Sequence, residues 1–166
     1  KGREDGSYAT SKLQRTWFLL TDKDGSVFFI DEGRGQTQNG ALRRARNGEV
    51  ETLVQCSSGP FQSPTCLAFS PAQDTLYISQ YAYTDENNTK TDFNIIYVTR
   101  EGGFVDVKGL SRFKKAGTTG LAVHPKTGEI FFQNKGTGYV YRFNGANNED
   151  YTPLFRINNA TEIETR

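Results

Sequence analysis

One pattern of apolar and polar positions occurs three times along this chain: a short apolar run, a polar turn and a second short apolar run. Val27, Leu76 and Ile130 open the second run of each copy, at spacings of 49 and 54 residues. Short apolar runs that are bounded by turn residues are typical of β-strands. A repeat of about 50 residues that holds four strands is typical of a β-propeller blade.

The repeats predict an all-β fold, a partial β-propeller of about three four-stranded antiparallel blades. The blades are expected at about residues 17–56, 64–108 and 119–157, with a polar lead-in at 1–16 and a polar tail at 158–166. No stretch has a 3.6-residue period, so almost no helix is expected. Closed propellers have at least four blades, and the chain contains no Met. We therefore expect a segment of a six-bladed propeller whose other blades belong to a longer chain or to another copy.

Turn residues separate the strands within each blade. Asp24-Gly25 and Asn47-Gly48 predict two-residue hairpin turns, because Gly, Asn and Asp tolerate the positive φ angles that such turns need. In the second blade, a turn at 100–103 and a fourth strand at Phe104–Val107 are expected.

The charged residues are balanced, with 20 Lys and Arg against 19 Asp and Glu and a net charge of +1. A chain of this kind has no broad positive field to attract nucleic acid or an anionic membrane, so we expect neither partner. No run of about 18 apolar residues is present, and membrane insertion is therefore not expected.

Cys56 and Cys66 are the only cysteines. One follows an outermost strand and the other opens an innermost strand, on opposite sides of a blade. This placement disfavours a disulfide without excluding it.

Several segments of the first blade resemble the NHL repeat, in the form found in exported Bacteroidetes proteins that join an IPT/TIG domain to an NHL propeller. The matching segments are Asp5-Gly6-Ser7-Tyr8-Ala9, Asp24-Gly25-Ser26-Val27-Phe28-Phe29-Ile30-Asp31, Ala41-Leu42-Arg43-Arg44 and Asn47-Gly48-Glu49-Val50-Glu51-Thr52-Leu53. Thr16-Trp17 stands where Pro-x-Gly is usual, and the second blade has a longer middle loop. The resemblance implies an NHL-type propeller in an exported protein at the cell surface or in the periplasm.

The residue that closes the second apolar run is Asp31, Gln80 or Asn134 in successive blades. Equivalent positions of a propeller gather around its axis, so these oxygen-bearing side chains could bind calcium or a sugar at one mouth of the channel. The NHL propellers resemble in outline the gluconolactonase-type hydrolases, whose metal lies on that axis. Alternatively, in NHL repeats this residue bonds the backbone of the adjoining loop.

The long middle loop of the second blade has the composition of a binding surface. Aromatic rings beside amides and carboxylates suit the apolar face and the hydroxyl groups of a sugar. The loop candidates are Tyr81, Tyr83, Asp85, Glu86, Asn87 and Asn88. The alternative is that the loop packs its tyrosines against the next blade.

Two other features have ordinary structural explanations. His124 is the single histidine and precedes Pro125, so we expect it to serve a turn between two strands. Arg43, Arg44 and Arg46 lie on the strand that is usually Arg-bearing and solvated in NHL repeats, so the resemblance implies solvated side chains. No aromatic platform accompanies them, which disfavours nucleic-acid binding.

Two functions from different classes remain open, beside a third possibility, a purely structural spacer. The first is a non-catalytic propeller segment that needs no cofactor and binds a glycan or a partner protein through its loops. The second is a calcium-dependent hydrolase of the gluconolactonase type, with Asp31 as one axial ligand.

Overall fold

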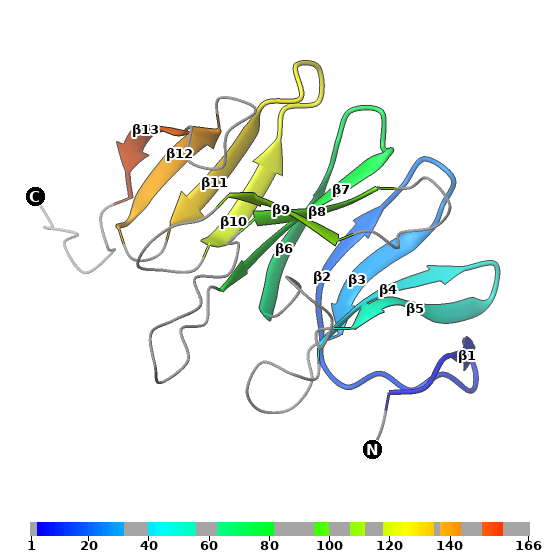
Figure 1. Ribbon diagram of the computed structural model, residues 1–166. Helices are drawn as coiled ribbons and strands as arrows, with labels where there is room; N and C mark the ends of the chain where they lie inside the picture. The colour runs from blue at the N-terminus through cyan, green and yellow to red at the C-terminus, as the bar shows by residue number, and fades with distance from the viewer. Residues whose placement is uncertain are drawn as a thin grey trace, which may run out of the picture.

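The computed structural model describes residues 3–31, 40–55, 63–81, 95–99, 107–111, 118–134, 137–143 and 151–157. These residues form strands, turns and connections, with no helix among them (Figure 1). The described part of the chain accordingly contains no helix long and apolar enough to cross a membrane.

The strands form three antiparallel sheets, which confirms the all-β fold predicted from the repeats. The first blade has the order β1-β5-β4-β3-β2. Its strands are β1 (Gly6–Ser7), β2 (Thr16–Thr21), β3 (Val27–Asp31), β4 (Ala41–Arg46) and β5 (Glu49–Gln55). The second blade comprises β6 (Ser63–Phe69), β7 (Thr75–Tyr81), β8 (Ile95–Thr99) and β9 (Val107–Ser111). The third blade comprises β10 (Thr118–Val123), β11 (Ile130–Asn134), β12 (Tyr139–Phe143) and β13 (Tyr151–Arg156).

The predicted register of the repeats is confirmed. Val27 and Ile130 are the first residues of β3 and β11, and Leu76 is the second residue of β7. Each of the three pairs with the last residue of the first strand of its blade. The three hairpins are therefore superimposable units, as the blades of a propeller require.

The blades stand side by side, with the first and the third at opposite ends of the array (Figure 1). Their first strands adjoin one another, since β6 contacts both β2 and β10. One apolar core joins the first two blades. Its buried members are Phe28, Ile30, Leu42, Val54, Leu67, Leu76 and Ile78.

Successive residues of each second strand point to opposite neighbours, because side chains alternate across a strand. Phe28 and Ile30 of β3 face the second blade, where they pack with Leu76 and Ile78 of β7. By the same alternation, Phe29 and Asp31 lie on the face of the first blade that points away from the second. We call this the outward face of the first blade.

One predicted hairpin turn is confirmed and the other is wrong. Asn47 and Gly48 both have positive φ, 50° and 86°, and connect the paired residues Arg46 and Glu49 as a two-residue turn. At the other site only Gly25 has positive φ, 80°. There the Asp22 N–H donates to the Ser26 carbonyl, which leaves a three-residue connection.

Asp22 explains the difference between the two turns. Its carboxylate Oδ1 accepts the N–H groups of Asp24 and Ser26 at 2.9 and 2.8 Å. These bonds favour a type I turn that ends in a left-handed glycine, a standard three-residue hairpin.

Two segments differ from the expected boundaries. β9 runs from Val107, paired with Val98, to Ser111, whereas the predicted strand ended at Val107. Phe104 and the predicted turn at 100–103 lie outside the described residues. The alternation of apolar and polar residues indicates that a strand is present. The register of that strand depends on the length of the turn that joins it to the preceding strand. The lead-in also contributes β1, whose Gly6 pairs with Val50 of β5.

Candidate functional site

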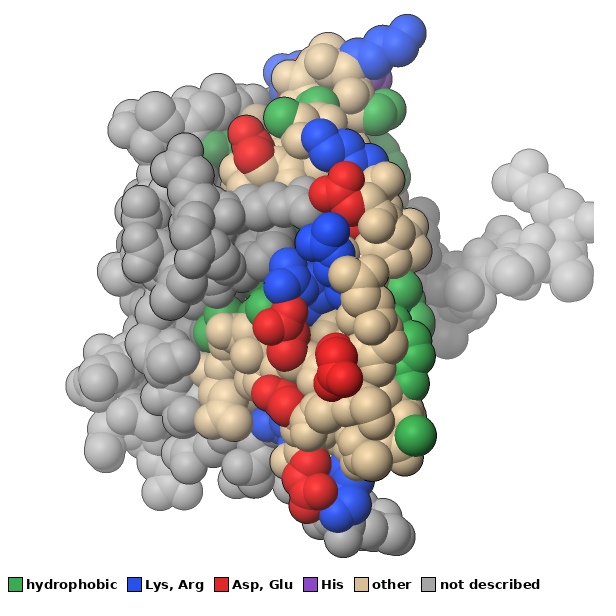
Figure 2. Space-filling view, turned by 90° about the vertical axis from the view of Figure 1, so that its right-hand side faces the viewer, with side chains coloured by type: hydrophobic (Ala, Val, Ile, Leu, Met, Phe, Trp, Pro, Cys, Tyr) green, Lys and Arg blue, Asp and Glu red, His purple; other side chains and the backbone are tan. Residues whose placement is uncertain are grey.

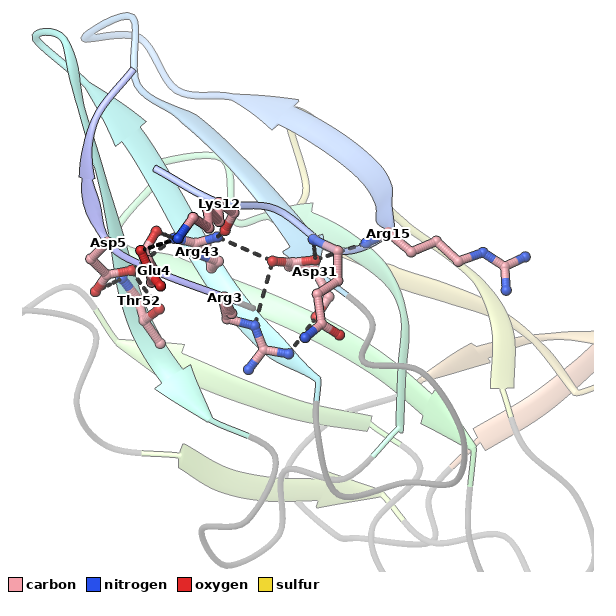
Figure 3. Close-up of polar contacts among 9 residues, drawn as sticks. Arg3, Glu4, Asp5, Lys12, Arg15, Asp31, Arg43 and Thr52 are labelled. Atoms are coloured by element: carbon pink, nitrogen blue, oxygen red, sulfur yellow. Dashed lines mark hydrogen bonds and ion pairs between the residues drawn. The ribbon is translucent and has the colours of Figure 1, made fainter. Parts of the chain in front are cut away.

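Asp31 lies at the end of β3 with its side chain fully buried, and both carboxylate oxygens are engaged (Figure 3). The backbone N–H groups of Gln14 and Arg15 donate to Oδ1 at 2.9 and 3.0 Å. Arg43 Nη1 donates to Oδ2 at 3.1 Å, and Arg3 Nε lies 3.4 Å from the same oxygen. Asp31 therefore has contacts on both oxygens with groups of its own chain.

Arg43 is also fully buried, so the prediction that this side chain is solvated is wrong. Its Nη1 also donates to the Lys12 carbonyl at 2.8 Å. Its Nη2 donates to the Glu4 carbonyl and to Asp5 Oδ1, both at 2.8 Å. A guanidinium leaves water at low cost only when its donors are satisfied. Nη1 and Nη2 of Arg43 have acceptors, whereas its buried Nε has no hydrogen-bond partner.

Asp31 and Arg43 together bind residues 3–15, here called the N-terminal segment, against the outward face of the first blade (Figure 3). The Tyr8 N–H also donates to the Gly48 carbonyl at 2.7 Å. The segment thus covers part of the outward face of the first blade.

Asp5 links the same segment to β5. Its Oδ2 accepts the Thr52 N–H, and its Oδ1 accepts the Thr52 hydroxyl, both at 2.8 Å. Burial raises the pKa of Asp5, but the hydrogen bonds from Thr52 and Arg43 and the charge of Arg43 outweigh it. The net result is a pKa below the ordinary value. The carboxylate form of Asp5 is therefore favoured in the folded chain.

The three predicted axial residues occupy equivalent backbone positions. Asp31, Gln80 and Asn134 pair with Thr16, Pro64 and Thr118 of the first strands. The Gln80 side chain lies outside the described part of the structure. Asn134 is buried, and its Oδ1 accepts the Thr137 N–H at 3.3 Å, a bond to the adjoining loop.

These contacts favour a structural role for Asp31 over metal binding. A calcium ligand needs an accessible carboxylate oxygen, whereas Oδ2 faces two guanidinium groups and Oδ1 accepts two amides. Among the residues that the structure describes, no three His, Cys, Asp or Glu side chains are grouped so as to hold a metal ion.

The predicted binding loop cannot be placed on the structure. Tyr83, Asp85, Glu86, Asn87 and Asn88 lie outside the described residues, and Tyr81 is described only by its backbone, which pairs with Ser63. The loop remains a prediction from its composition.

His124 caps the hairpin of the third blade. Its Nδ1 accepts the N–H groups of Lys126 and Thr127 at 3.3 and 3.1 Å. In the first blade, Asp22 bonds the hairpin backbone in the same place, and Ser70 does so in the second through the Thr75 N–H. This is the turn role predicted for His124.

A hollow of about 420 Å³ on the outward face of the first blade was not predicted. The first-blade hollow is lined by the apolar and aromatic side chains of Tyr8, Leu13, Leu19, Val27, Phe29, Ala45 and Val50, together with Ser11 and Thr16. Leu19 is 71% exposed and Tyr8 is 58% exposed. The alternation of apolar and polar residues places Leu19 and Val27 in strands, but it does not show which side of a strand is covered by other residues.

The side of the molecule turned toward the viewer in Figure 2 has charges of both signs. Lys and Arg side chains alternate with Asp and Glu across its described part, with no large patch of one sign. Among the described residues, Arg44 of β4 and Glu51 of β5 also form an ion pair, with Arg44 Nε donating to Glu51 Oε1 at 2.6 Å. A mixed surface of this kind has no extended field for a polyanion.

No protein-family model matches the chain, and no curated protein sequence matches it. Solved structures do resemble it in fold. An auxiliary nutrient binding protein from Bacteroides thetaiotaomicron superimposes with a TM-score of 0.69 at 22% identity, over 93% of this chain and 34% of that one. A gluconolactonase from Xanthomonas campestris gives 0.62 at 20% identity, over 84% of this chain and 46% of the other.

A third similar structure is the calcium-binding protein regucalcin from Agrobacterium tumefaciens. Its TM-score is 0.60 at 21% identity, over 82% of this chain and 44% of that protein. This chain therefore spans between about a third and a half of the length of these proteins. The likeness shows the fold alone, a partial β-propeller, and the NHL resemblance stays a prediction.

Proposed function

We propose that this chain is the binding portion of a larger β-propeller and acts without catalysis. The proposal rests on the contacts of the Asp31 carboxylate. Asp31 is the only carboxylate among the three predicted axial residues. Its oxygens already bind Arg43 and two backbone amides. Freeing it for a metal or a reacting group would leave the buried Arg43 without its partner, which is costly.

The ligand that we propose is a glycan or a protein bound through blade loops. Two of the similar structures are described as auxiliary nutrient binding proteins from Bacteroides species. Propellers and other rigid scaffolds generally place binding groups on long loops. The second-blade loop that begins at Tyr81 is the longest candidate in the sequence, and its aromatic and amide residues suit a sugar. An exported protein at the cell surface or in the periplasm fits this function.

The test is glycan-array binding followed by calorimetry with the best glycan. The Tyr81→Ala, Tyr83→Ala double variant is expected to weaken binding at least tenfold, since each ring supplies stacking area. Tyr139→Ala is the matched control, because Tyr139 is an exposed tyrosine of the third blade. Equal binding by the double variant and the control would contradict the proposed loop site.

The competing hydrolase is tested on the unmodified chain. Lactone and ester turnover is measured with added calcium and with a chelator. Turnover that requires calcium would overturn the binding proposal. Binding without turnover would support it.

A further inference from the structure

The outward face of the first blade has a polar half and an apolar half. In the polar half, Asp31 and Arg43 bind the N-terminal segment (Figure 3). By alternation along β3, Val27 lies on the same face as Asp31. Val27 pairs with Ala45, and Ala45 pairs with Val50. Directly opposed residues of antiparallel strands point to the same face, so these three side chains form the apolar half.

The first-blade hollow lies over the apolar half, and Phe29 and Val50 form its floor. Both residues line the hollow and are nearly buried, with 4% and 6% of their surface exposed. The guanidinium carbon of Arg43 lies 5.9 Å from the centroid of the Phe29 ring. A cation at this distance over an aromatic ring is attracted to it. The Phe29 ring is therefore held by the same side chain that binds the N-terminal segment, and the floor is already formed.

The N-terminal segment supplies one wall of the hollow. Tyr8, Ser11 and Leu13 line it from this segment. Between the last two, the carbonyl of Lys12 accepts a hydrogen bond from Arg43 Nη1 at 2.8 Å. The hollow is therefore complete only while the segment is attached to the sheet.

The chemistry of the lining indicates which class of molecule the hollow suits. Its volume of about 420 Å³ is within the usual range for small-molecule sites. The described residues that line it carry no charge, and their polar side-chain groups are the hydroxyls of Tyr8, Ser11 and Thr16. A charged group placed against such a lining would lose water without gaining a partner. The rings of Tyr8 and Phe29 suit contact with another ring.

We propose that the first-blade hollow binds a neutral, largely apolar small molecule that contains a ring, and that the N-terminal segment completes the site. This site is separate from the second-blade loop proposed for a glycan or a protein. A molecule in the hollow contacts both the segment and the sheet. Binding and attachment of the segment therefore stabilise each other.

Two fluorescent probes test the charge preference on the whole chain. N-phenyl-1-naphthylamine is neutral, and 8-anilinonaphthalene-1-sulfonate has the same rings with an added sulfonate. The neutral probe is expected to bind saturably, one molecule per chain. The sulfonate is expected to bind more weakly by roughly tenfold or more, because its charge has no partner in the hollow. Equal affinities, or no saturable binding of the neutral probe, would overturn the inference.

Variants locate the neutral probe. Leu19→Asp places a charge at the edge of the hollow and is expected to weaken binding by roughly tenfold or more. Leu19 is 71% exposed, so the fold is expected to tolerate the change. Leu154→Asp is the matched control, because Leu154 is a 45% exposed leucine of the third blade. Ala45→Leu fills part of the hollow without adding a charge and is also expected to weaken binding. Similar affinities in Leu19→Asp and Leu154→Asp would place the probe elsewhere and overturn the inference.

Hydrogen exchange tests the part played by the N-terminal segment. Saturation with the neutral probe is expected to slow exchange in residues 3–15 and to leave the third blade unchanged. Unchanged exchange in residues 3–15 would contradict a site completed by this segment. Light scattering of the same solutions identifies a different occupant. Loss of the probe as copies of the chain associate would show that a protein surface covers the hollow, which would also overturn the inference.

Discussion

The Arg43 guanidinium lies 3.1 Å from the Asp31 carboxylate, and neither side chain is exposed to solvent. A buried pair of this kind adds little net stability compared with apolar residues, but breaking it leaves an uncompensated charge. Arg43 also holds the Lys12 and Glu4 carbonyls. Arg43 is therefore one of the side chains that attach the N-terminal segment, together with Asp31 and Asp5.

Arg43→Met is expected to lower the free energy of unfolding by about 3–5 kcal/mol, the usual cost of removing one partner of a buried ion pair. Urea denaturation followed by circular dichroism measures it. Arg44→Met is the control on the same strand, since Arg44 is partly exposed and pairs with Glu51. It is expected to cost at most about 1 kcal/mol. Similar losses in the two variants would contradict the structural role of Arg43.

The lowered pKa of Asp5 predicts that acid weakens the attachment of the N-terminal segment. Its pKa in the folded chain is below the ordinary value of 3.8, so the unfolded chain binds the proton more readily. Stability from Asp5 is complete above the ordinary pKa and is lost as the pH falls through the folded-state pKa. Hydrogen exchange of the N-terminal segment is therefore expected to accelerate as the pH is lowered below about 4, relative to the pH dependence of free peptides.

The control for this pH effect is Asp74, a fully exposed residue whose pKa is also lowered by hydrogen bonds from Ser70 and Thr75. Asp5→Asn is expected to remove the acid sensitivity of the N-terminal segment, whereas Asp74→Asn leaves it unchanged. An unaltered pH profile in Asp5→Asn would show that other groups govern the attachment.

The three hairpins were predictable because the signal for each lies within about 15 residues. Alternation and turn residues placed Val27, Leu76 and Ile130 in one register without knowledge of the neighbours. The state of Arg43 was not predictable in this way. Its partners Glu4 and Lys12 are 39 and 31 residues away, and an Arg on a strand looks the same in sequence whether its face is solvated or covered.

For the candidate site, the sequence predicted the positions of the residues on the strands but not the contacts of their side chains. Sequence placed Asp31 and Asn134 at equivalent strand ends, as the pairing shows. It could not show that Arg43 and the amides of Gln14 and Arg15 already satisfy Asp31. The first-blade hollow was not predicted either, because the alternation that places Leu19 in a strand does not show which side of the strand is covered.

Gly48 provides a test of the two-residue turn between β4 and β5. Its φ of 86° is unfavourable for a residue with a Cβ, but a Cβ added there would meet no atom within 4 Å. Gly48→Ala is therefore expected to destabilise the chain by about 1–2 kcal/mol through backbone strain alone. Gly120→Ala is the control, because Gly120 lacks a positive φ and its added Cβ would make only ordinary contacts. Thermal unfolding that ranks the two variants equally would contradict the assigned turn.

The alkylation rate of the Cys66 thiol provides a test of the contact between the second and third blades. Its side chain is 8% exposed, and its thiol donates to the Leu121 carbonyl of β10 at an Sγ–O distance of 3.6 Å. Burial raises the pKa of Cys66, so little of the reactive thiolate forms near neutral pH. Alkylation of Cys66 in the native chain is therefore expected to be at least a hundredfold slower than in urea, as followed by mass spectrometry of the peptide. Native alkylation at the rate of a free thiol would mean that β6 and β10 separate readily. In that case the second and third blades would not form a continuous packed array.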